Sequence, residues 1–220
     1  MSFAPLVHVV REAAGEPEGA LILLHGRGAD EHDLGPVLDG LDPERRLVGL
    51  TPGAPLPGPG ASGGRWWYMV PRVGYPDPTT FHATYGQLTA FLDGWLQDRA
   101  IPWEHTLIGG FSMGCVMSYA TGLGPRRPAP AGILAMSGFI PTVEGWEPEP
   151  ETRPDLPVFI THGARDPVIS VNFARDARRR LEAAGLPVEY GEHDGGHHLQ
   201  PRGLPRMTEW VAQRVAQFAP

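Results

Sequence analysis

A serine set between glycines is the residue of this chain best suited to covalent chemistry. Residues 110–114 read Gly-Phe-Ser-Met-Gly and match the pattern Gly-x-Ser-x-Gly around Ser112. The apolar run 106–108 before it predicts a buried strand, and residues 113–123 after it predict a helix. A strand, a glycine-rich turn and a helix in this order favour a nucleophile elbow, in which a strained turn exposes the serine hydroxyl. A structural tight turn is the alternative.

The base that a serine nucleophile needs must be a histidine in this chain. All 18 basic residues are arginines, so a serine–lysine dyad and a lysine Schiff base are excluded. Three histidines follow the weak predicted strand 188–190, and all three compete for the role of base: His193, His197 and His198. A pair of glycines within this loop allows it to bend a histidine back over the edge of the sheet.

The acid that would orient this histidine is Asp166. It follows the predicted strand 157–160 on a short loop, where a carboxylate can reach a histidine. An aspartate before Pro167 also commonly begins a helix, and this is the competing interpretation. The candidates come in the order Ser, Asp, His that an elbow fold requires, each after a separate strand.

Two backbone N–H groups predict an oxyanion hole. One belongs to Met113, the residue after the nucleophile, and the other to Arg27, in the sequence His-Gly-Arg-Gly that follows the apolar run 20–24. Such donors stabilise the negative oxygen that develops when a serine attacks an ester carbonyl. A plain tight turn is the alternative for residues 25–28.

Short apolar runs alternate with helix-like stretches along the chain. The predicted strands cover residues 20–24, 47–50, 106–108, 132–136, 157–160 and 188–190. The predicted helices cover residues 82–99, 113–123, 171–184 and 204–218. This alternation indicates an α/β fold, with a mostly parallel central sheet and helices on both faces. The length of 220 residues and the lack of a linker favour a single domain, residues 1–220, without a large lid domain.

Two long loops rich in proline and glycine supply candidate substrate-binding residues. They cover residues 52–78 and 141–157 and follow predicted strands, so both should rise from the carboxyl edge of the sheet. Aromatic and apolar side chains in or beside them are predicted to line an acyl pocket: Trp66, Trp67, Tyr68, Phe139 and Ile140. Packing against the core is the competing explanation for each of them.

Composition excludes several classes of partner. The formal net charge is −7, from 18 basic and 25 acidic residues, and no basic stripe marks a nucleic-acid surface. The apolar run 20–24 is too short to span a membrane, and residues 1–15 lack the regions of a signal peptide. Cys115 is the only cysteine, so no disulfide forms within the chain. We therefore expect a cytoplasmic protein without a membrane span, and exposed apolar loops leave a homodimer open.

Four motifs together resemble the bacterial carboxylesterase/phospholipase family of α/β-hydrolases, which includes acyl-protein thioesterases. They are LLHGRGAD (23–30), GGFSMG (109–114), HGARDPVI (162–169) and GGHHLQP (195–201). The family's catalytic histidine directly follows a glycine, so the resemblance implies His197 as base, with Ser112 as nucleophile and Asp166 as acid. It also implies the α/β-hydrolase fold, with oxyanion donors at Arg27 and Met113.

Two residues depart from the family pattern. Met113 stands where the family commonly has glutamine, which removes a side-chain contact but leaves the backbone donor in place. Arg27 stands where many members have leucine. An arginine at this place either favours an acidic substrate or points into solvent, and the sequence leaves both alternatives open.

The resemblance implies hydrolysis of a small-molecule carboxylic ester through an acyl-enzyme, with no cofactor and no metal. An acyl-protein thioesterase or a lysophospholipase on the same machinery is the nearest alternative, and a non-catalytic ligand-binding protein of this fold is a more distant one. A metal hydrolase is the other rival, with ligands drawn from His162, Asp166, His193, His197 and His198. The glycines between His193 and His197 argue against a helical metal site.

Overall fold

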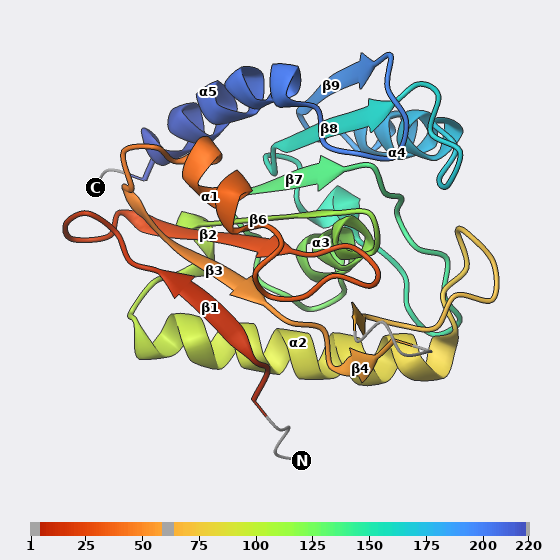
Figure 1. Cartoon of the computed structure of the whole chain (residues 1–220), viewed down its shortest axis with the longest axis horizontal. Coiled ribbons are helices and arrows are strands. Elements are labelled where there is room, and N and C mark those ends of the chain that lie inside the picture. Colours follow the sequence, from red (N-terminus) through yellow and green to blue (C-terminus); the bar gives the residue numbers. More distant parts are fainter. Residues whose placement is uncertain (1–4, 59–63, 219–220) are drawn as a thin grey trace.

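A seven-stranded sheet forms the centre of the computed structural model, which describes residues 5–58 and 64–218 (Figure 1). Its strands lie in the order β1-β3-β2-β6-β7-β8-β9. They are β1 (His8–Arg11), β2 (Gly19–Leu24), β3 (Leu47–Pro52), β6 (Thr106–Phe111), β7 (Gly132–Met136), β8 (Val158–Gly163) and β9 (Val188–His193). Among these strands β1 alone runs antiparallel to its neighbour, and every other pair is parallel. The predicted mostly parallel sheet is confirmed.

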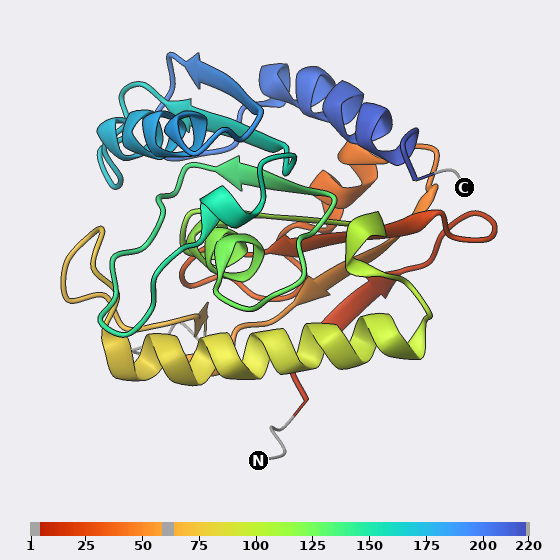
Figure 2. The same ribbon diagram turned by 180° about the vertical axis from the view of Figure 1, so that it is seen from behind.

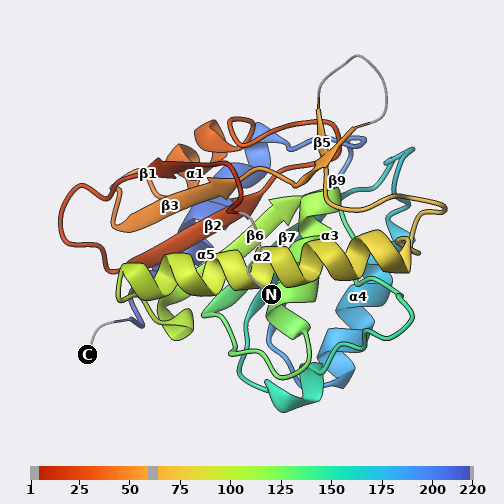
Figure 3. The same ribbon diagram turned by 90° about the horizontal axis from the view of Figure 1, so that it is seen from below.

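Helices cover both faces of the sheet, as the sequence predicts. In the described part of the chain they are α1 (Gly35–Leu41), α2 (Pro78–Asp98), α3 (Met113–Leu123), α4 (Asn172–Ala183) and α5 (Leu204–Val215). One apolar cluster joins α1 and α5 to the sheet, and the other joins α2, α3 and α4 to its opposite face. Figure 3 shows α1 above the strands and α4 below them, and Figure 2 shows the face covered by α2 and α3.

Strand β2 shows why the central strands read as unbroken apolar runs. Leu21 and Leu23 belong to the cluster under α1 and α5, whereas Ile22 and Leu24 belong to the cluster under α2, α3 and α4. All four side chains are fully buried. A strand buried on both faces has no polar side to alternate with its apolar one.

Several short elements fall outside the sequence-based predictions. The edge strand β1 and the seven-residue helix α1 were not predicted, and the loop after β3 contains a small hairpin of β4 (Leu56–Pro57) and β5 (Arg65–Trp66). Helix α2 begins at Pro78, four residues before the predicted start, because the Asp77 side chain accepts from the Thr80 N–H at 2.8 Å and caps it. Short 3₁₀ helices lie at η1 (Trp103–His105), η2 (Pro150–Thr152) and η3 (Pro201–Gly203).

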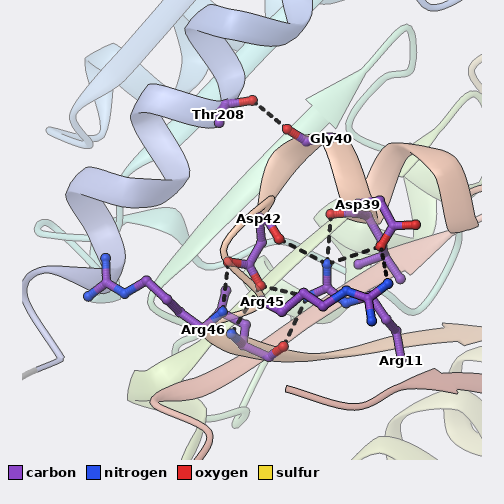
Figure 4. Close-up of polar contacts among 9 residues, drawn as sticks. Arg11, Asp39, Gly40, Asp42, Arg45, Arg46 and Thr208 are labelled. Carbon is purple, nitrogen blue, oxygen red and sulfur yellow. Dashed lines mark hydrogen bonds and ion pairs between the residues drawn. The ribbon is translucent and has the colours of Figure 1, made fainter. Parts of the chain in front are cut away.

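A buried ion pair fastens the edge strand β1 to the turn between α1 and β3 (Figure 4). The Arg11 guanidinium donates to Asp42 Oδ2 at 2.5 Å and to the Leu47 carbonyl at 2.9 Å. The two Asp42 carboxylate oxygens also accept from the N–H groups of Arg46 and Leu47, both at 3.0 Å. Thr208 of α5 donates to the Gly40 carbonyl at 2.7 Å, so α1 is tied to its neighbouring helix as well.

Candidate active site

Ser112 lies at the turn between β6 and α3, at the carboxyl edge of the sheet. Its φ of 55° and ψ of −116° place a residue with a side chain in a strained backbone conformation. The turn requires glycine at position 114, because a Cβ there would lie 1.9 Å from the Leu24 carbonyl oxygen. The Ser112 N–H donates to the Met136 carbonyl at 2.9 Å, so the hydrogen-bond ladder of the sheet reaches the candidate nucleophile itself.

The structure brings Ser112, His197 and Asp166 into one hydrogen-bonded chain. His197 Nε2 lies 2.8 Å from Ser112 Oγ, and His197 Nδ1 lies 2.6 Å from Asp166 Oδ2. Because an ionised carboxylate only accepts hydrogen bonds, Nδ1 carries the ring proton and Nε2 accepts from the serine hydroxyl. This geometry suits a serine that is activated by a histidine and a histidine that is oriented by an aspartate.

The loop after β8 keeps the Asp166 carboxyl ionised. Asp166 Oδ1 accepts from the N–H groups of Val168 and Ile169, each at 2.8 Å. Burial acts to raise the pKa of this carboxyl, but the hydrogen bonds from Ile169, His197 and Val168 outweigh burial and lower the pKa. A negative charge at this place stabilises the positive imidazolium that forms when His197 takes a proton.

A second buried histidine supports the same loop. His162, on β8, donates from Nε2 to the Ile169 carbonyl at 2.8 Å, and its Nε2 lies 3.4 Å from Asp166 Oδ2. Burial lowers the pKa of His162, which favours the neutral ring. Its Nδ1 is buried without a hydrogen-bond partner among the described residues. From the sequence this residue was considered only as a metal ligand, although a histidine inside an apolar strand, four residues before the candidate acid, was a usable signal.

Side chains from separate elements fix the loop between β2 and α1. His25 donates from Nδ1 to the Gly26 carbonyl at 2.7 Å, and its Nε2 accepts from the Ala54 N–H at 3.0 Å. Trp67 donates from its indole N–H to the His25 carbonyl at 2.9 Å, and its backbone N–H donates to Met113 Sδ at 3.1 Å. The sulfur of Met113 therefore joins the residue after Ser112 to the aromatic segment, which the sequence had not indicated.

The two predicted oxyanion donors are unoccupied by protein groups. Among residues 5–58 and 64–218, no carbonyl or side chain accepts a hydrogen bond from the backbone N–H of Arg27 or of Met113. The neighbouring Gly28 N–H, by contrast, donates to the Arg65 carbonyl at 3.0 Å. Arg27 and Met113 line the same pocket as Ser112, and an oxyanion requires free backbone donors of this kind.

A small pocket opens beside Ser112. Its volume is about 50 Å³, and its lining is mostly apolar: Arg27, Tyr68, Val70, Val73, Ser112, Met113, Phe139, Val168 and Ile169. A larger cavity of about 440 Å³ lies elsewhere, between α5 and the starts of β7 and β8, and contains none of these residues. Of these two cavities, the small pocket is the one that adjoins the Ser112 hydroxyl.

The predicted substrate-binding residues divide into two groups. Tyr68 and Phe139 line the pocket beside Ser112, whereas Trp66, Trp67 and Ile140 are not part of that lining. Trp67 is fully buried and holds the loop after β2, as its two hydrogen bonds show.

Four of the nine lining residues were not predicted from the sequence, and all four are branched aliphatic side chains: Val70, Val73, Val168 and Ile169. Val70 and Val73 carry no sequence signal of their own, whereas Val168 and Ile169 end the motif HGARDPVI, which had pointed only to Asp166.

The histidine-rich loop does not assemble a metal site in the described part of the chain. Within residues 5–58 and 64–218 no group of three histidine, cysteine, aspartate or glutamate side chains lies so as to hold a metal ion. The rings of His193 and His198 face one another at 5.9 Å, and the Gly195 N–H donates to His193 Nδ1 at 3.2 Å.

Each helix in the described part of the chain is too short or too polar to cross a membrane.

The mostly parallel sheet, the serine elbow and the late histidine loop define an α/β-hydrolase. The family model described as phospholipase/carboxylesterase matches residues 6–214, and the chain belongs to this family of serine hydrolases. The chain is therefore a hydrolase of this family.

Named relatives agree with this assignment. The chain is 24% identical to acyl-protein thioesterase 1 homolog 1 of Dictyostelium discoideum over 173 residues. The aligned residues cover 76% of each chain. It is 24% identical over 211 residues to carboxylesterase SOBER1 of Arabidopsis thaliana, covering 89% of this chain and 90% of that one. The Bacillus cereus carboxylesterase structure superimposes with a TM-score of 0.82 at 22% identity and covers 95% of this chain and 94% of its own.

Proposed function

We propose that this protein hydrolyses small carboxylic esters by a two-step acyl transfer on Ser112. The observation that carries the proposal is the hydrogen-bonded chain from Ser112 Oγ through His197 to Asp166, at 2.8 Å and 2.6 Å. Ser112 Oγ attacks the ester carbonyl while His197 Nε2 takes the hydroxyl proton, and the leaving alcohol then receives that proton. Water attacks the acyl-enzyme with His197 again as base, which releases the carboxylic acid and restores the serine.

The backbone N–H groups of Arg27 and Met113 stabilise the oxyanion in this proposal. Both are free of protein acceptors among the described residues, and both belong to segments fixed by hydrogen bonds of Trp67. Donors held in place before the reaction need no reorganisation when the charge develops, and each contributes about 3–4 kcal/mol where such donors have been removed. In this mechanism residues 1–220 act as a single domain, because the proposed catalytic groups are spread along the chain from Arg27 to His197.

The deciding experiment compares the wild type with Ser112→Ala on para-nitrophenyl esters of graded acyl length. We expect hydrolysis by the wild type and a fall to the spontaneous rate in Ser112→Ala. A fluorophosphonate probe should label Ser112 in the folded wild type and leave Ser112→Ala unlabelled. Undiminished hydrolysis by Ser112→Ala would overturn the mechanism, and a folded wild type that is neither labelled nor active would favour a ligand-binding protein.

A short acyl group is the substrate that the pocket favours. A volume of about 50 Å³ between Tyr68, Val73, Phe139 and Ile169 leaves little room for a long chain. We expect kcat/KM to fall as the acyl chain lengthens beyond what this pocket holds. Tyr68→Phe keeps the ring and serves as the control for Phe139→Ala, which enlarges the pocket and should shift the optimum to longer chains.

A thioesterase is the second candidate, and the acyl-protein thioesterase named among the relatives favours it. The same serine, histidine and oxyanion donors would act on a thioester, because the attacked carbonyl carbon and its oxygen are alike in both substrates. Acetyl and butyryl thioesters measured beside the matching oxygen esters separate the two activities. A lysophospholipase activity is tested in the same way with lysophosphatidylcholine.

The oligomeric state and the location of the protein are further parts of the proposal. Exposed apolar side chains, Met69, Tyr75 and Val168 among them, offer a surface through which two copies can pair. Sedimentation equilibrium with Val168→Glu as the matched variant measures this pairing. A cytoplasmic location agrees with the single buried cysteine, Cys115, and cell fractionation tests it.

A further inference from the structure

Arg27 and Arg65 lie on neighbouring segments, which the hydrogen bond from the Gly28 N–H to the Arg65 carbonyl joins, and the two side chains have different environments. Arg65 is committed to protein groups: its Nη1 donates to the Ala54 carbonyl at 3.1 Å, and its Nε lies 3.7 Å from Glu31 Oε2. Arg27 is exposed, and among the described residues no carboxylate lies within ion-pair distance of its guanidinium. The acid nearest to it in sequence, Asp30, accepts from the His32 N–H at 2.9 Å. Within the described part of the chain, Arg27 thus has a positive charge with no carboxylate partner.

An aromatic ring holds this charge in position. The Arg27 guanidinium carbon lies 5.2 Å from the centre of the Trp66 ring, a distance at which a cation is attracted to the face of an indole. A guanidinium placed over a ring still presents the N–H groups along its edge, in a planar fork that matches a carboxylate. Stacking also restricts a long side chain before a ligand arrives, which lowers the entropy lost on binding.

The position of Arg27 is beside the reactive serine. Arg27 lines the pocket together with Ser112 and Met113, and it is the one charged residue among the described residues of that lining. Burial raises the pKa of the Tyr68 hydroxyl on the pocket wall, and the positive charge of Arg27 opposes that rise. The pocket lining itself places Arg27 beside Tyr68 and Ser112.

We propose that Arg27 binds a carboxylate carried by the ester substrate, so that the enzyme prefers anionic esters to neutral esters of the same size. This inference rests on the proposed esterase function. In the proposed mechanism the backbone N–H of Arg27 binds the oxyanion, and the guanidinium lies at the far end of the same residue's side chain. The substrate carboxylate is accordingly separated from the reacting carbonyl by several bonds, on either the acyl or the alcohol part.

The test measures a ratio of kcat/KM values for matched esters. The acyl arm compares mono-para-nitrophenyl adipate with para-nitrophenyl hexanoate, and the alcohol arm compares meta-carboxybenzyl butyrate with benzyl butyrate. Rates with Ser112→Ala are subtracted, which removes the spontaneous reaction of the half-ester. The arm in which the wild type prefers the anion identifies the part of the substrate that carries the carboxylate.

Variants of Arg27 separate charge recognition from general activity. In that arm we expect the anionic-to-neutral ratio to fall about tenfold in Arg27→Leu, the size of a lost charge-assisted hydrogen bond. Arg27→Lys should recover part of the ratio, since an ammonium supplies charge without the planar fork. Arg72→Leu is the matched control, because Arg72 also stacks on an exposed ring, that of Tyr75 at 3.7 Å, on a neighbouring loop. It should leave the ratio unchanged.

Trp66→Leu gives a second, independent measurement, because it removes the ring under the guanidinium and keeps the Arg27 backbone. The ratio should fall in this variant also. An unchanged ratio in Arg27→Leu and Trp66→Leu, with neutral esters still cleaved, overturns the inference and leaves the esterase function intact. A wild type that cleaves no ester faster than Ser112→Ala defeats the esterase function, and the inference then fails with it.

Discussion

His162 Nε2 lies 3.4 Å from Asp166 Oδ2, the same oxygen that receives the hydrogen bond of His197. Both side chains are fully buried, and the His162 Nε2–H is donated to the Ile169 carbonyl at 2.8 Å. Ile169 in turn donates its N–H to Asp166 Oδ1. His162 therefore acts through the loop that orients Asp166 and is a positioning residue in the proposed mechanism.

Replacement of His162 should lower turnover more than substrate binding. His162→Leu removes the donor to Ile169, and we expect kcat to fall about 10- to 100-fold, because small displacements of catalytic groups are costly. His162→Gln retains an N–H donor and should recover much of the rate. His32→Gln is the control, since the His32 side chain is 72% exposed. Equal activity of His162→Leu and the wild type would contradict this role.

Stability should decrease as the pH falls from about 7 to about 5. Burial lowers the pKa values of His162 and His25 below the ordinary value of 6.5. The unfolded chain therefore binds more protons than the folded one just below pH 6.5, and the free energy of unfolding falls with pH there. Urea unfolding across this range measures the slope. His162→Gln should show a shallower slope, and an identical slope would refute the assignment of a buried neutral His162.

The strained backbone at Ser112 should cost stability that glycine recovers. Ser112→Gly and Ser112→Ala both lack the hydroxyl and should be inactive, but glycine tolerates a φ of 55°. We expect Ser112→Gly to be about 1 kcal/mol more stable than Ser112→Ala. Thermal unfolding of the two variants measures the difference.

Gly94 provides the control for this comparison. It lies within helix α2, and a Cβ there would meet no atom within 4 Å, so Gly94→Ala should stabilise by up to about 1 kcal/mol. The same exchange of glycine and alanine should thus have opposite signs at the two positions. A more stable Ser112→Ala would show that the turn is not strained.

The contact between Met113 and Trp67 should depend on an acceptor atom at residue 113. Met113→Leu keeps the volume but leaves the buried Trp67 N–H without its sulfur partner, at a cost of about 1–3 kcal/mol. Met113→Gln supplies a carbonyl oxygen and should be destabilised less. Chemical denaturation gives the free energies of unfolding, and ester hydrolysis gives kcat. Better tolerance of leucine than of glutamine would show that packing decides at this position.

Breaking the buried ion pair of Arg11 and Asp42 should lower the free energy of unfolding. Their side chains are only 10% and 5% exposed, so Arg11→Met leaves a buried carboxylate without its cation. We expect a loss of about 3 kcal/mol in the free energy of unfolding. Arg45→Met breaks only the exposed contact to Asp39 at 3.5 Å and should change stability by less than about 1 kcal/mol.

The sequence predicted the central strands and the long helices because their apolar patterns are unbroken. It failed at β1, whose four residues His8–Arg11 form a short edge strand, and at α1, whose seven residues include two glycines. In these elements tertiary contacts such as the Arg11–Asp42 pair replace local preference. The start of α2 was missed although Asp77 and Pro78 form a recognisable cap.

The three side chains that the structure brings together, Ser112, Asp166 and His197, stand in glycine-rich motifs after strands. The residues alone left His193, His197 and His198 open as the base, and only the family resemblance favoured His197. The residues that line the pocket were less predictable. Tyr68 lines the pocket, whereas the adjacent Trp67 is fully buried and is not part of the lining. No pattern of two neighbouring aromatic residues tells which one faces the pocket.

The sheet ladder continues past β6 and β7 into the site, through the bonds from the Ser112 N–H to the Met136 carbonyl and from the Ser137 N–H to the Thr161 carbonyl. Both rungs consist of backbone atoms. The separation between the strand that ends in the serine and the strand that leads to the acid is thus set by two strand spacings, each about 4.8 Å. New loops can therefore be grafted around the pocket to change what enters it, because main-chain hydrogen bonds set the spacing between the strand of Ser112 and the strand that leads to Asp166.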